Sequence, residues 1–214
     1  MQIFQISGDA DKFGYLRTPD LPKCESGESP YVMQFIDCSS NEASLKDSWR
    51  SVPLRTDAKS RRKVDIWNAG PVPLIVADTF LQTTPLRSYI ERSCELLPVT
   101  VDDAPAHVLN LWRTDRCLDV DGSIYHQKLE WKDGKSYPVR DMLKFLRFDL
   151  ALMPTDRLFK VGGGLRSQIF TVHFPDEERD DDFVAIYRRE GYKGLEFVLR
   201  WDTDNPDAEI KAIF

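Results

Sequence analysis

Residues 65–101 read DIWNAGPVPLIVADTFLQTTPLRSYIERSCELLPVTV, and this stretch gives the clearest indication of the fold class. The apolar run PLIVAD predicts a strand that ends at Asp78, where Asp78 or Thr79 is placed to cap a following helix. Apolar residues at helical spacing continue that helix, and Pro85 predicts either a break in it or its first turn. The segment ELLPVTV then predicts a second strand.

The rest of the chain mixes strands and helices without a regular strand–helix–strand alternation. The expected fold class is therefore α+β, with a mixed, mainly antiparallel sheet and a few helices packed on it. DG pairs at 121–122 and 133–134 predict turns, and Gly191 is placed to end a helix in the left-handed conformation. Further strands are expected at 31–38, 106–120, 157–174 (two strands around a glycine turn) and 195–201, a helix from about residue 181, and a short helix running into a strand at 140–153.

The length of 214 residues fits one large domain or two small lobes that share a core. Residues 1–64 form a β-rich, irregular segment that is either a lobe of its own or part of the domain formed by residues 65–214. Within the first segment, residues 46–63 carry seven basic and two acidic residues. This segment suggests either a nucleic-acid patch or a solvated linker, and the acidic total of the chain favours the linker.

The composition excludes several classes of protein. The net charge of −6 disfavours nucleic acid as a direct ligand, and no apolar run is long enough to span a bilayer. The N-terminus lacks the features of a signal peptide, so we expect a cytoplasmic protein that does not bind membranes. The four cysteines and three histidines are widely separated, which predicts neither a metal site nor a disulfide framework, and no cofactor motif is present.

No arrangement typical of catalysis is visible in the sequence. The glycines of VGGGLRSQ lack the lysine and hydroxyl residue of a phosphate-binding loop, and no nucleophile elbow occurs. His107 and His126 have no carboxylate partner at a recognisable spacing, and His173 falls in a predicted strand. We therefore assign no catalytic residue and expect a protein that is not an enzyme, with a small cytoplasmic enzyme of unrecognised type as the alternative.

The stretch PDEERDDDF, residues 175–183, has six acidic residues and one arginine in nine positions. One or two acids there favour a helix start, and Asp180 or Asp181 is placed to be its N-cap. Six acids also create a local negative field that attracts a basic partner. We therefore take six acidic residues as the candidate partner-binding residues: Asp176, Glu177, Glu178, Asp180, Asp181 and Asp182.

Five motifs follow one another along the chain: PLIVADTF, ELLPVTV, HVLNLWRTDRCLDVDGS, RFDLALMPTDRLFKV and DDFVAIYRREGYKGLEF. In this order they resemble the bacterial immunity-protein family numbered eleven among polymorphic-toxin immunity proteins, once catalogued as a domain of unknown function. The resemblance covers roughly residues 65 to 200, and residues 1–64 and the stretch EERDDD match the family less clearly.

The resemblance implies a protein that binds a cognate bacterial toxin and neutralises it by non-catalytic occlusion. An antidote kept in the cytoplasm must meet a toxin that acts there, such as a nuclease. Because nucleases present basic clefts to phosphate, the expected partner is a protein toxin with a basic surface, and the acidic antidote would mimic its substrate's charge.

Overall fold

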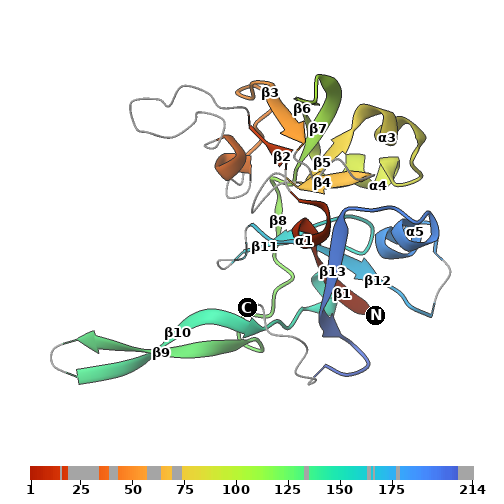
Figure 1. Cartoon of the computed structure of the whole chain (residues 1–214). Coiled ribbons are helices and arrows are strands. Elements are labelled where there is room, and N and C mark those ends of the chain that lie inside the picture. The colour runs from red at the N-terminus through yellow and green to blue at the C-terminus, as the bar shows by residue number, and fades with distance from the viewer. Residues whose placement is uncertain are drawn as a thin grey trace.

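The computed structural model shows an α+β protein with several small sheets and short helices (Figure 1). It describes residues 1–14, 16–18, 34–38, 43–56, 64–68, 74–132, 135–162, 165, 167–176 and 179–206. Most strand pairs are antiparallel, as the sequence predicts. The expected fold class is therefore confirmed.

The largest sheet has six strands in the order β2-β3-β6-β7-β5-β4. Its neighbours are antiparallel except for β3 and β6, which run parallel. The central hairpin β6–β7 turns through two residues with positive φ, Asp102 and Asp103. The strands are β2 (Leu16–Arg17), β3 (Val52–Thr56), β4 (Ile66–Asn68), β5 (Leu74–Ala77), β6 (Glu95–Val101) and β7 (Ala104–Asn110).

Apolar residues cover both faces of this sheet. On one face, a helical turn at residues 34–38 and the chain around Leu45 pack against β3, β6 and β7. On the other face lie helices α3 (Asp78–Thr83), α4 (Arg87–Ser93) and α5 (Phe183–Arg189). Because both faces are covered, strands such as β5 are apolar at successive positions rather than alternating.

A second sheet joins the two ends of the chain. Strand β1 (Gln2–Gly8) lies between β12 (Ile169–His173) and β13 (Leu195–Asp202), antiparallel to both. The same sheet packs α5 on one face and a cluster around Phe148, Phe170 and Trp201 on the other. Residues of the 1–64 segment therefore pair with strands of the 65–214 segment here and, through β3 and β6, in the larger sheet.

The remaining elements lie outside these two sheets. Strands β9 (Ile124–Lys132) and β10 (Lys135–Phe145) form a long hairpin that projects from the body (Figure 1). Strands β8 (Thr114–Asp115) and β11 (Lys160–Val161) form a short parallel pair. The other two elements are helix α1 (Ala10–Phe13) and the 3₁₀ turn η1 (Leu150–Leu152).

Two predicted elements are wrong in type. The part of 31–38 that the structure describes, residues 34–38, is helical, because a single turn places both Phe35 and Cys38 in the core of the larger sheet. The helix expected at the start of 140–153 is instead the end of β10, which pairs with β9. Residues 52–56 of the expected linker form β3, with Val52 and Leu54 buried.

The helix boundaries in the 65–101 stretch follow the prediction in part. The helix is broken around Pro85, since α3 ends at Thr83 and α4 begins at Arg87. The predicted cap is wrong: Ala77 is the N-cap, and the side chain of Asp78, already in the helix, accepts a hydrogen bond from Gln82. The aliphatic strand residues continue directly into the helix, so no polar residue stands at the cap position.

Two glycines of GYKGLEF shape the connection between α5 and β13. Gly191 follows the C-terminal residues of α5 with φ of 68°, the left-handed conformation predicted from the sequence. Gly194 has φ of 116°, and a Cβ there would overlap the carbonyl oxygen of Ile66. The amide of Ile66 and that of Asp65 both bond to the carbonyl of Lys193, which joins β4 to the start of β13.

Candidate functional site

Asp182 is part of the internal structure of the protein. It is 2% exposed and is the N-cap of α5, where Oδ1 accepts a hydrogen bond of 2.9 Å from the amide of Ala185. Its Oδ2 accepts from the amide of Phe174 and lies 2.8 Å from Nδ1 of His173. An ionised carboxylate only accepts, so this geometry assigns the ring proton of His173 to Nδ1. The cap expected at Asp180 or Asp181 is therefore Asp182.

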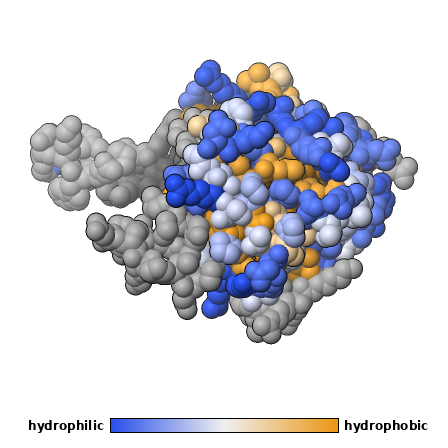
Figure 2. All heavy atoms as spheres, turned by 90° about the horizontal axis from the view of Figure 1, so that it is seen from above, coloured by the Kyte–Doolittle hydropathy of each residue, from blue (hydrophilic) through white to orange (hydrophobic). Residues whose placement is uncertain are grey.

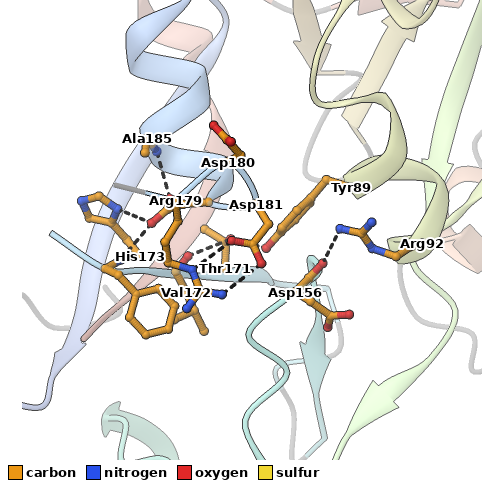
Figure 3. Close-up of polar contacts among 12 residues, drawn as sticks. Tyr89, Arg92, Asp156, Thr171, Val172, His173, Arg179, Asp180, Asp181 and Ala185 are labelled. Atoms are coloured by element: carbon orange, nitrogen blue, oxygen red, sulfur yellow. Dashed lines mark hydrogen bonds and ion pairs between the residues drawn. The ribbon is translucent and has the colours of Figure 1, made fainter. Parts of the chain in front are cut away.

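Asp181 is held by a neighbouring arginine. Its two carboxylate oxygens each accept a 2.9 Å bond from the guanidinium of Arg179, which also stacks on the ring of Phe174 (Figure 3). The Arg179 hydrogen bonds lower the pKa of Asp181 below its usual value. This pair closes the turn that leads into α5.

The other acids of the stretch lie at the surface or outside the described residues. Asp180 is fully exposed and points away from the Arg179–Asp181 pair, with its carboxylate 3.8 Å from the guanidinium of Arg189 (Figure 3). Asp176 is also exposed, whereas Glu177 and Glu178 lie outside the described residues. The structure therefore brings Asp181 and Asp182 into local hydrogen bonds and presents Asp176 and Asp180 to solvent.

Two histidines have carboxylate partners that the sequence did not reveal. His173 pairs with Asp182 as described, and both side chains are buried at the start of α5. Nε2 of His107, on β7, lies 3.2 Å from Oδ1 of Asp78 at the start of α3. These partners are 9 and 29 residues away in the chain, so only the tertiary structure pairs them. The side chain of His126 lies outside the described residues.

A concavity of about 560 Å³ opens beside the base of the β9–β10 hairpin. Its floor is formed by Phe148 and Trp201, which belong to the aromatic cluster behind the second sheet. Its other lining residues come from the chain before β9 and from η1: Arg116, Leu118, Asp119, Val120, Asp121, Asp149 and Leu150.

Exposed aliphatic residues gather around this concavity. Among the described residues, the large apolar side chains with the highest exposure are Leu152 (56%), Leu150 (54%), Ile124 (52%), Val120 (47%) and Ile36 (46%). All except Ile36 lie on its lining or on the segments that flank it. Apolar areas also occur between hydrophilic residues on the end that carries α3 and the larger sheet (Figure 2), but isolated exposed apolar residues are common. A cluster of them is the informative feature.

Acidic side chains hold the two loops of this surface in shape. Oδ1 of Asp119 accepts a 2.8 Å bond from the amide of Gly122, in the predicted DG turn. Oδ1 of Asp149 accepts a 3.0 Å bond from the amide of Ala151 and caps η1. These Asx-type bonds fix the loops that present Val120 and Leu150 to solvent.

The sequence analysis missed this surface. From the sequence, the DG pair at 121–122 predicts only a turn, and DLALM falls in the segment 140–153, where a helix running into a strand is expected. The available signal was a set of aliphatic residues placed next to turn-forming aspartates, where loops are otherwise polar. The sequence pattern does not show that Leu118 and Phe148 form a bridge, and this bridge brings the two loops together.

No protein-family model, no curated protein and no solved structure matches this chain. The resemblance to immunity family eleven therefore stays a prediction from the motifs. The structure itself establishes an α+β protein with mainly antiparallel sheets. No helix in the described part of the chain combines the length and apolar character needed to cross a membrane.

Proposed function

We propose that this chain is an immunity protein that binds a cognate bacterial toxin and blocks it by occlusion, without catalysis. The sequence motifs supply the protein class, and the exposed apolar concavity beside the β9–β10 hairpin is the observation that supports a protein-binding role. Such clusters on the surface of soluble proteins mark protein contacts. The proposed location is the cytoplasm, where the toxin would act.

The chemistry of the concavity indicates what the toxin presents to it. Leu150, Leu152 and Val120 offer apolar area that a partner side chain would cover, at about 25 cal/mol per Å² removed from water. The lining contains three aspartates and one arginine, so its net charge is negative. The matching toxin surface has an apolar anchor surrounded by lysine or arginine, as a nuclease cleft would provide.

The main contact with the toxin would therefore lie at the concavity and not at residues 176–182. Asp182 and Asp181 already hold the start of α5, so an exchange of either disturbs the protein as well as its surface. Only Asp176 and Asp180 are exposed in the described part of the stretch. They would contribute long-range attraction to a basic toxin rather than an anchor.

The test is co-expression with the C-terminal domain encoded by the neighbouring reading frame, followed by a growth assay and co-purification. The native chain should rescue growth and form a complex. The double variant Leu150→Asp/Leu152→Asp should lose the complex, because it places charge where the partner's apolar group would be buried. Ile36→Asp is the matched control, since Ile36 has similar exposure but lies away from the concavity.

Two outcomes would contradict the proposal in different ways. Growth arrest with no complex for the native chain would remove this toxin as its partner. Full binding by Leu150→Asp/Leu152→Asp would keep the function but remove the concavity from the interface. The double variant Asp176→Asn/Asp180→Asn then tests the acidic stretch, since a contact there would weaken the complex and reduce its salt dependence.

A further inference from the structure

The β9–β10 hairpin has two strand edges that no other strand of the described structure pairs with. The two strands form a sheet of their own, paired from Lys132–Lys135 at the tip to Ile124–Phe145 at the base. The register is regular from Lys135 to Arg140 of β10 and shifts between Arg140 and Phe145. The hairpin stands clear of both larger sheets (Figure 1). A two-stranded hairpin is only marginally stable in water, and an open edge is a template for another strand.

The two edges differ in their ability to accept a strand. β10 contains Pro138, which pairs in register with Leu129 and has no N–H to donate. A proline in an edge strand blocks further pairing at that point. β9 (Ile124–Lys132) contains no proline, so every residue along its outer edge retains an N–H. The competent edge is therefore that of β9.

The sequence of β9 is complementary to itself when two copies run antiparallel. Lys128, Leu129 and Glu130 are consecutive. A two-fold axis at Leu129 places Lys128 opposite the partner subunit's Glu130 and Glu130 opposite the partner subunit's Lys128. Residues directly opposite each other in an antiparallel pair are close, and opposite charges there stabilise the pair.

We propose that the edge of β9 that does not face β10 pairs with β9 of a second copy of this chain, with the two-fold axis at Leu129. The two hairpins then form one four-stranded antiparallel sheet, in the order β10-β9 of one copy followed by β9-β10 of the other. The contact is isologous, so it closes as a dimer and does not continue into a filament.

The neighbouring registers are less favourable. An axis at Lys128 would place two lysines opposite each other and Glu130 opposite His126. The dimer does not depend on the proposed toxin.

The first experiment measures the mass of the full chain in solution by sedimentation equilibrium across the micromolar range. The native chain should form a dimer. Lys128→Glu and Glu130→Lys each replace both attractive pairs by repulsive ones and should weaken the dimer at least tenfold. The variant with both exchanges restores the opposite charges and should dimerise, as should an equimolar mixture of the two single variants.

The mixture is the decisive sample. If a single exchange weakened the dimer by damaging the fold, mixing the two variants would not restore association. Restored association would therefore show that the charges at positions 128 and 130 face each other. A native chain that stays monomeric throughout would overturn the proposal. Dimers unaffected by either single exchange, or a mixture that fails to associate, would show that another surface is used.

A second measurement tests the register without relying on charge. Leu129→Cys places one thiol at the two-fold axis, and mild oxidation should link two chains by a disulfide. Gln127→Cys is the matched control, since position 127 faces position 131 in this register. Equal crosslinking by both variants, or none by Leu129→Cys, would contradict the proposed pairing.

Discussion

Replacing Asp182 by alanine should cost this protein a large part of its stability. The side chain makes three contacts within 2.9 Å: to the amides of Ala185 and Phe174 and to Nδ1 of His173. Loss of the helix cap costs about 1 kcal/mol. The other two donors, at part-buried Phe174 and buried His173, would lose their acceptor at about 1–3 kcal/mol for a buried group. Because Phe174 is only part-buried, its donor takes the lower end of that range, and the three contributions sum to an expected loss of about 3–5 kcal/mol. A typical total stability is about 5–15 kcal/mol.

The assay is urea unfolding followed by fluorescence, with Asp180→Asn as the control. Asp180 is fully exposed, so its exchange should leave the free energy of unfolding nearly unchanged. Asp182→Asn should lose an amount of unfolding free energy between those of Asp182→Ala and Asp180→Asn. The side-chain amide oxygen can still accept one hydrogen bond, but the amide N–H₂ group then faces other donors. A loss below about 1 kcal/mol for Asp182→Ala would refute the structural role of this residue. Because Asp182 stabilises the fold and Asp180 does not, a variant with residues 180–182 all exchanged would lose stability as well as surface charge. Its affinity for a partner would therefore not report on binding alone.

Two further predictions concern stability. Gly194→Ala should cost about 3 kcal/mol or more, because φ of 116° disfavours a side chain and the new Cβ overlaps the carbonyl of Ile66. Gly162→Ala, where a Cβ would meet nothing within 4 Å, should be nearly neutral in the same urea titration. Burial raises the pKa of Cys38, Cys117 and Tyr187 to about 12. Since these groups ionise earlier in the unfolded chain, the unfolding free energy should fall as pH rises from about 9 toward about 12. A constant urea midpoint over that range would contradict their burial.

Local signals in the sequence were sufficient for several parts of the fold. The helix that begins after the acidic stretch was found because its apolar residues share one face and Gly191 ends it. The strand at β6 and the break at Pro85 were also found, since proline and β-branched residues act on their own backbone. The structures of residues 34–38 and 140–145 were not predicted correctly. In residues 34–38 the packing of Phe35 outweighed local preference, and in residues 140–145 the pairing with β9 did so.

The candidate site shows the same division. The α+β class, the negative charge and the position of the acidic stretch could be predicted from the sequence, because they depend on composition and on neighbours in the chain. The burial of Asp182 at the start of α5 and the exposure of Asp176 and Asp180 became visible only in the folded chain. The same holds for Val120 and Leu150, which share one surface because Leu118 bridges to Phe148. Burial and contact depend on segments that are distant in the chain, and a linear pattern contains no information on which of them meet.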